Sequence, residues 1–317
     1  MTKKKITQTN EQKFYKELIK IIKSKKPNKT KLSNIKIKLS SEYDLKKIPT
    51  DTDIFLNAAE KDLKLLRKLI LRKPVRTGSG VSVVAVMTKP FPCPHGSCNI
   101  CPGGPNKNPK KSVPQSYTGK EPATMRGIRA GYDPYIQIFN RLEQYAVQGH
   151  NSSKIELIIM GGTFPSFPKS YQNTFIKLCF KAMNDFSKLF FKNKKFDFQK
   201  FKKFFELPGE LGNEKRVKKV QTKIKKLKIK NKKSLLQEQK NNQKSNVKCV
   251  GLTIETRPDF AMLKHANQLL DMGCTRVELG VQSIFDSVLK KIHRGHKVID
   301  TIKSTEILKD LGFKTTT

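Results

Sequence analysis

The 317 residues suffice for one large domain or two ordinary ones. Hydrophobic residues make up only 36% and charged residues 29%, so part of the chain should add little to a core. No apolar run reaches transmembrane length and no apolar signal core follows the N-terminus, which argues against an integral membrane or secreted protein. We expect a soluble, cytoplasmic protein.

The formal net charge of +39 points to a polyanionic partner or an acidic surface, and RNA is the simplest candidate. Frequent Lys, Asn, Ile and Phe together with the absence of Trp are also what an AT-rich genome would produce. Both explanations of the charge stay open, and its distribution along the chain is more informative than its total.

Two helical patterns come first in the chain. The Lys-rich residues 1–40 contain an apolar stripe at Leu18, Ile19, Ile21 and Ile22, and residues 41–78 repeat apolar side chains at helical spacing. Pro74 closes the second pattern. The sequence therefore predicts a basic helical region over residues 1–78.

Strands and helices alternate from residue 79 onward. Runs typical of strands cover residues 82–87, 154–160, 249–254 and 276–281, and residues 313–315 begin a fifth. Helices are predicted near residues 134–148, 169–186, 260–272 and 298–311. Apolar strands joined by helices indicate an α/β fold with a parallel sheet covered on both faces.

A basic segment, at about residues 187–247, interrupts this alternation. Between residues 181 and 248, 22 Lys or Arg stand against 6 Asp or Glu, a net charge of +16. We predict an insertion on the outside of the fold that is partly helical or disordered. An RNA-contacting arm and a solvated insertion without a role both fit this composition.

Three of the six cysteines, Cys93, Cys98 and Cys101, lie within nine residues directly after the first predicted strand. In a reducing cytosol such a group is more often metal-binding than disulfide-bonded. Three thiolates can hold three irons of a four-iron cubane and leave the fourth iron open. Together with His95 they could instead form a zinc site.

The position of this loop favours the iron–sulfur interpretation. Ligands of parallel α/β folds gather beyond the carboxyl ends of the strands. The cysteines follow the first predicted strand, and Gly161, Gly162 and Thr163 follow the second. Together these two loops are a more specific signal than either alone.

These motifs resemble the radical S-adenosylmethionine (SAM) superfamily and, within it, the family of Elongator catalytic subunits and archaeal tRNA uridine(34) acetyltransferases. The gap between Cys93 and Cys98 resembles the shorter archaeal form of the loop. The matching stretches are residues 73–80, 93–105, 115–119, 121–122, 126, 129–130, 132–135, 160–164, 253–259, 273–276, 278–283 and 294–296.

The resemblance implies a partial (β/α)6-type barrel over residues 79–317, incomplete at its C-terminal end, and a 4Fe-4S cluster on Cys93, Cys98 and Cys101. It implies SAM or substrate contacts at strand ends facing one cavity, although charged residues at a barrel mouth also pair with each other. It names no catalytic residue, and it likens the basic N-terminal region to a tRNA-binding segment. The implied cofactor contacts are Gly161, Gly162, Thr163, Glu255, Arg257 and Gln282.

The implied activity is that of an acyltransferase, in which a radical reaction started by SAM transfers a carboxymethyl group from acetyl-CoA to carbon 5 of the tRNA wobble uridine. Family members complete the barrel and add an acetyltransferase-like domain. We expect residues 1–317 to be a fragment, or to depend on a separate acetyltransferase-domain polypeptide. A catalytically incomplete RNA-binding or scaffold subunit and a zinc-stabilised binding module are the competing interpretations.

Overall fold

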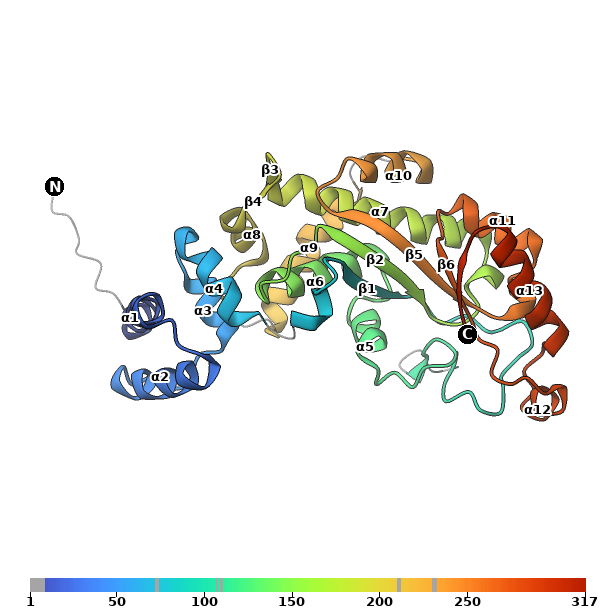
Figure 1. Cartoon of the computed structure of the whole chain (residues 1–317), viewed down its shortest axis with the longest axis horizontal. Helices are drawn as coiled ribbons and strands as arrows, with labels where there is room; N and C mark the ends of the chain where they lie inside the picture. Colours follow the sequence, from blue (N-terminus) through green and yellow to red (C-terminus); the bar gives the residue numbers. More distant parts are fainter. Residues whose placement is uncertain (1–8, 72–73, 107, 109–110, 210–211, 230–232) are drawn as a thin grey trace.

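The computed structural model describes residues 9–317 apart from 72–73, 107, 109–110, 210–211 and 230–232. The first eight residues of the predicted basic region therefore lie outside the described residues. The N-terminal helices lie at one end of an elongated molecule, and the sheet extends toward the other end (Figure 1). No helix in the described part of the chain is long and apolar enough to cross a membrane.

The N-terminal region is helical, as predicted. Thr9 and Gln12 form a capping box at the start of the first helix, which ends at Lys26 in the left-handed conformation. Phe14, Leu18 and Ile22 are fully buried, and each such side chain contributes about 1.5–3 kcal/mol to folding. The elements are α1 (Asn10–Lys25), α2 (Lys29–Glu42), α3 (Asp51–Asn57), η1 (Glu60–Asp62), α4 (Leu63–Ile70) and η2 (Pro74–Thr77).

A five-stranded parallel sheet forms the centre of the fold, in the order β1-β2-β5-β6-β7. All five strands fall where the sequence predicts them. Because they are parallel, the loops that follow them gather at one edge. The strands are β1 (Ser82–Met87), β2 (Lys154–Met160), β5 (Lys248–Thr256), β6 (Arg276–Leu279) and β7 (Lys314–Thr316).

The two faces of the sheet are not equally covered. Alternate residues such as Val84, Leu157 and Ile254 are completely buried, whereas Glu255 and Glu278 on the other face are only half-buried. The prediction of a sheet covered on both faces is therefore wrong. Half-buried carboxylates are compatible with a face that lines the interior of an incompletely closed barrel, where water still reaches the strands.

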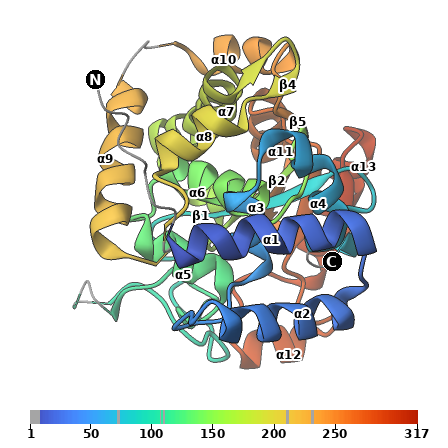
Figure 2. The same ribbon diagram turned by 90° about the vertical axis from the view of Figure 1, so that its left-hand side faces the viewer.

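The predicted helices of the α/β unit are present, with shifted ends. The helix predicted at residues 169–186 continues to Phe190, and it packs along the helix that starts at Pro134 (Figures 1 and 2). The helices of this unit, which include the short helices α5 and α12 besides the four predicted ranges, are α5 (Pro122–Arg129), α6 (Pro134–Val147), α7 (Lys169–Phe190), α11 (Leu263–Asp271), α12 (Asp286–Lys291) and α13 (Val298–Asp310), with 3-10 turns η4 (Phe164–Ser166) and η5 (Pro258–Phe260).

The basic segment is structured in its described part. It forms the hairpin β3 (Phe191–Lys192) and β4 (Lys195–Phe196), followed by α8 (Phe198–Phe205), α9 (Glu214–Ile229) and α10 (Leu235–Gln243). Its first part adds aromatic rings to the core, which the lysine count concealed. Together with Phe186 of α7 these rings form what we call the aromatic cluster: Phe186, Phe190, Phe196, Phe198, Phe201 and Phe205.

Candidate functional site

The cysteine loop, residues 93–101, lies over the carboxyl edge of the sheet and is held by a buried amide. Gln115 accepts a hydrogen bond from the Cys93 backbone N–H (2.5 Å) and donates to the Gly96 carbonyl oxygen and to Ser97 Oγ (both 3.2 Å). Gln115 is only 4% exposed. Gln115 belongs to the matching stretch at residues 115–119, but the sequence gives it no role, because only the folded structure shows its hydrogen-bond partners.

Each cysteine sulfur of the loop lies next to a polar group. Cys93 Sγ lies 3.6 Å from Thr163 Oγ1, and Cys98 Sγ lies 3.1 Å from His95 Nε2. The backbone N–H of Ser116 donates to Cys101 Sγ (3.2 Å). Hydrogen bonds of this kind stabilise sulfur that carries negative charge, as in a cluster thiolate.

Among the described residues, no group of three or more Cys, His, Asp or Glu side chains is placed to hold a metal ion. All three cysteines are free and half-buried. The donor set fits a three-thiolate cluster in chemistry, and the assignment of Cys93, Cys98 and Cys101 as ligands stays a prediction.

A cavity of about 380 Å³ opens beside the cysteine loop. It is bounded by Cys93 and by residues at the ends of β2, β5, β6 and β7, and five of the six predicted cofactor contacts share it. Cys98, Cys101 and Gly161 are not among the residues that line it. The predicted contacts in its wall are Gly162, Thr163, Glu255, Arg257 and Gln282.

Gly161 has a structural reason to be glycine. Its φ is 124°, and a Cβ there would lie 2.2 Å from Thr88 Oγ1. Thr88 Oγ1 donates to the Gly161 carbonyl oxygen at 3.1 Å, which ties the turn after β2 to the end of β1. The turn thereby places Gly162 and Thr163 in the cavity wall.

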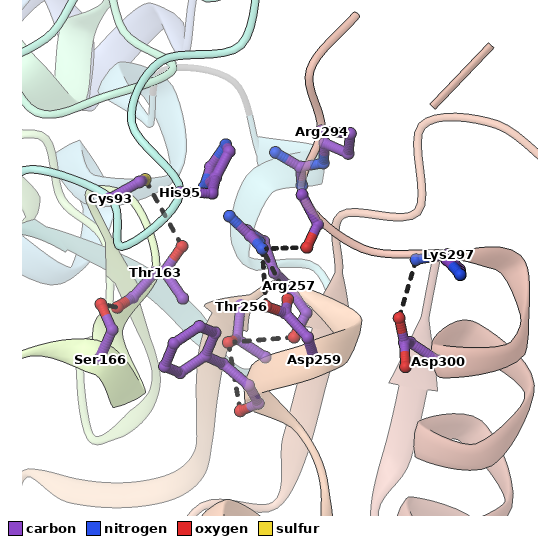
Figure 3. Close-up of polar contacts among 12 residues, drawn as sticks. Cys93, His95, Thr163, Ser166, Thr256, Arg257, Asp259, Arg294, Lys297 and Asp300 are labelled. Atoms are coloured by element: carbon purple, nitrogen blue, oxygen red, sulfur yellow. Dashed lines mark hydrogen bonds and ion pairs between the residues drawn. The ribbon is translucent and has the colours of Figure 1, made fainter. Parts of the chain in front are cut away.

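Arg257 pairs with a neighbouring carboxylate, as charged barrel-mouth residues often do. Its Nε lies 2.9 Å from Asp259 Oδ1 and its Nη2 lies 2.6 Å from Asp259 Oδ2 (Figure 3). Nη2 also donates to the Gly295 carbonyl oxygen at 3.1 Å. Within the described structure Nη1 is buried without a hydrogen-bond partner, so the guanidinium keeps one donor for a ligand.

Two carboxylates face each other across β5 and β6, where Glu255 is in register with Glu278. Burial raises the pKa of Glu255 to about 7; a hydrogen bond from Tyr117 (2.8 Å to Oε2) opposes this shift, and the charge of Glu278 adds to it. Burial, with the adjacent Glu255 charge, also raises the pKa of Tyr117. At neutral pH the cavity therefore contains a carboxyl group that can hold or release a proton.

The raised pKa of Glu255 predicts a stability effect that depends on pH. Between about pH 4.5 and 7 the folded chain keeps a proton that the unfolded chain releases, so the free energy of unfolding falls as pH rises through that window. Glu255→Gln removes this penalty. We expect the variant to equal the parent near pH 4.5 and to exceed it by about 3 kcal/mol at pH 8.

Urea unfolding at pH 4.5, 6 and 8 measures this difference. Glu60→Gln, at an exposed position, controls for the loss of one negative charge. A difference between Glu255→Gln and the parent that is the same at all three pH values would contradict the shifted pKa.

Arg294 is a site residue to which sequence reasoning gave no role. It lies between α12 and α13 and is 9% exposed, yet its side chain reaches the cysteine loop (Figure 3). Its Nη1 lies 3.6 Å from Cys98 Sγ, and its Nη2 donates to the Gly280 carbonyl oxygen at 2.7 Å. The only sequence signal was its place in the 294–296 motif.

The fold and site match a known class of protein. The family model of the Radical SAM superfamily matches residues 93–317, and the model of the ELP3 N-terminal domain matches residues 12–78. The chain therefore belongs to the radical SAM superfamily.

Curated relatives carry the names that the motifs suggested. The chain is 45% identical over 266 residues to the tRNA uridine(34) acetyltransferase of Methanocaldococcus infernus, covering 84% of this chain and 41% of the relative. It is 36% identical over 288 residues to human Elongator complex protein 3, covering 89% and 44%. The predicted resemblance to this family is confirmed, and the chain spans about two fifths of the length of these relatives.

A solved structure is also similar. The archaeal Methanocaldococcus infernus Elp3 with an N-terminal deletion of residues 1–46 matches at 36% identity and a TM-score of 0.48, over 74% of this chain and 37% of that chain.

Proposed function

We propose that this chain carries the radical-SAM chemistry of an acyltransferase that modifies the wobble uridine of tRNA. The observation that carries the proposal is the position of the cysteine loop. It lies over the carboxyl edge of a parallel sheet, and Cys93 shares a cavity with the ends of four strands. The names of the relatives support tRNA as the substrate class.

In this proposal Cys93, Cys98 and Cys101 would hold a 4Fe-4S cluster that binds SAM. When bound, the cluster and SAM supply a radical able to remove hydrogen from carbon. Gly162 and Thr163 present backbone and hydroxyl oxygens to the SAM amino group, and Gly161 shapes their turn. The distance of 3.6 Å between Thr163 Oγ1 and Cys93 Sγ supports a SAM site next to the cysteine loop.

The charged residues of the cavity bind the remaining polar groups. Arg257 offers its free Nη1 to an anionic group, while Asp259 holds the guanidinium in place. Glu255 and Gln282 accept hydrogen bonds from hydroxyl or amino groups.

Acetyl-CoA is the proposed acyl donor, because the archaeal relatives are named acetyltransferases. We assign it no site among the described residues. The proposal places its binding on a further domain or a separate polypeptide.

RNA binding is proposed for residues 1–78 and for the insertion at about residues 187–247 of the barrel unit 79–317. A cavity of about 1090 Å³ between α1, α3 and η1 is lined by Lys16, Lys20, Lys23 and Lys61.

Helix α9 divides its basic residues between two faces. On one face, Lys228 forms an ion pair with Asp133, and Lys223 forms one with Glu206. On the other face, three lysines are exposed to solvent: Lys215, Lys218 and Lys225.

The exposed face of α9 gives a prediction. Replacing Lys215, Lys218 and Lys225 by Gln should weaken RNA binding and reduce the slope of log affinity against log salt by about 2–3, because up to three phosphate contacts are lost. Fluorescence anisotropy with tRNA at several salt concentrations measures the slope. The matched control replaces Lys264, Lys303 and Lys309, exposed lysines on or beside α11 and α13 at the far side of the molecule (Figures 1 and 2).

Equal slopes in the two triple variants would show that the α9 face is not an RNA contact.

SAM cleavage tests the proposed function. The anaerobically reconstituted chain, given dithionite and SAM, should produce methionine and 5′-deoxyadenosine in equal amounts. A chain with full iron that never cleaves SAM would contradict the proposal and favour an RNA-binding or scaffold role. A chain that takes up zinc and no iron would favour the zinc-stabilised binding module.

A further inference from the structure

Arg294 and the cysteine loop belong to one rigid junction. The Asn99 backbone N–H donates to the Ile292 carbonyl oxygen (3.0 Å), and Asn99 Nδ2 donates to the Lys291 carbonyl oxygen (3.1 Å). The Arg294 backbone N–H in turn bonds the Leu289 carbonyl oxygen (2.9 Å). The end of α12 therefore fixes the turn at Cys98 and the start of the Arg294 side chain relative to each other.

The guanidinium of Arg294 is held in a fitted position. A Cβ at position 280 would lie 2.6 Å from its Nη2, so any larger residue there would require the guanidinium to shift. From this position Nη2 bonds the Gly280 carbonyl oxygen and Nη1 points to Cys98 Sγ. The fork geometry of arginine makes both contacts at once.

Among the described residues, the positive charge of the Arg294 guanidinium has no negative charge within ion-pair distance. Arg257 and Arg294 are 3% and 9% exposed, and Asp259 pairs with Arg257. No carboxylate in the described parts of the chain lies within ion-pair distance of Arg294, and its Nε is buried without a hydrogen-bond partner there. A buried cation without a counter-charge is costly, so this position is suited to an anionic neighbour.

We propose that Arg294 is a positioning residue that places a fixed positive charge against the Cys98 side of the cluster and thereby raises its reduction potential. The inference rests on the proposed function, since the cluster supplies the negative charge. Potentials of iron–sulfur clusters depend on net charge and on hydrogen bonds to sulfur, and Arg294 supplies both. A cluster held by Cys98 would gain negative charge on reduction, and the guanidinium of Arg294 would stabilise that charge.

The test compares the parent chain with R294Q and R294K. Each is reconstituted anaerobically, its iron is counted, and the cluster is titrated with dithionite while its electron paramagnetic resonance signal is followed. At the parent's midpoint potential, the ratio of reduced to oxidised cluster in R294Q should fall about tenfold, a shift of 59 mV to more negative potential. R294K, which keeps the charge, should restore most of the ratio.

R276Q is the matched control, because Arg276 pairs with Glu156 (2.9 Å) at the opposite end of β6. Its midpoint should equal the parent's. R294Q with full iron and an unshifted midpoint would overturn the inference and leave the proposed function standing, whereas a parent chain without iron would overturn the proposed function itself. If R294Q loses iron, retention of iron by R294K supports the proposed role of the positive charge at position 294. Equal loss of iron in both variants contradicts that role.

Discussion

Replacing Cys101 by alanine is expected to remove the iron from the reconstituted chain and to lower SAM cleavage by more than about 100-fold. Loss of a single hydrogen bond to a metal ligand already costs about 10–100-fold, so loss of the ligand itself costs more. With only two protein thiolates left, two of the four irons would have no protein ligand. Iron analysis and the yield of 5′-deoxyadenosine measure the two effects.

Two further variants make this result specific. Cys249→Ala removes a sulfur that lies in β5, outside the cysteine loop, so this variant should keep the parent's iron. His95→Ala separates the two kinds of metal site: it removes a ligand of a three-cysteine, one-histidine zinc site, whereas a three-cysteine cluster loses only the contact of His95 with Cys98 and should keep much more iron than in Cys101→Ala. Parental iron in Cys101→Ala would contradict the ligand assignment.

The second large effect is expected in the aromatic cluster. Phe201 is fully buried, and its ring centroid lies 4.8 Å from that of Phe205 and 5.5 Å from that of Phe190. Phe201→Ala should therefore lower the free energy of unfolding by about 3–5 kcal/mol, the range for a large side chain removed from a packed core. Urea denaturation followed by far-UV circular dichroism measures it.

The exposed Phe285, with 61% of its surface accessible, gives the matched control. Phe285→Ala should change the free energy of unfolding by no more than about 0.5 kcal/mol. Equal, small effects of the two substitutions would show that the basic segment is only loosely attached to α7 and adds little to the core.

The strands and the site could be predicted because the sequence patterns that indicate them lie within short stretches of the chain. A run such as Ser82–Met87 is apolar and rich in valine, and the chemistry-bearing loop follows it directly. Once the strands were taken as parallel, the edge at which Cys93, Thr163 and Glu255 meet followed from topology alone. The cavity brings these three residues together as expected.

Other features depend on contacts between distant residues, and sequence reasoning missed them. The contacts of Gln115 and Arg294 with the cysteine loop join positions 22 and 196 residues apart. The aromatic cluster was concealed because its phenylalanines alternate with lysines, so composition favoured a solvated insertion. The unequal burial of the two sheet faces was missed because half-buried strand residues such as Ile158 are as apolar as buried ones.

The most direct test of the account is the metal content of the whole chain, purified and reconstituted without oxygen. We predict about four iron and four acid-labile sulfide per chain, as for a 4Fe-4S cluster, and a Mössbauer signal in which one iron changes its environment when SAM is added. Zinc without iron, or iron that does not respond to SAM, would contradict the claim that Cys93, Cys98 and Cys101 hold a cluster with one open corner.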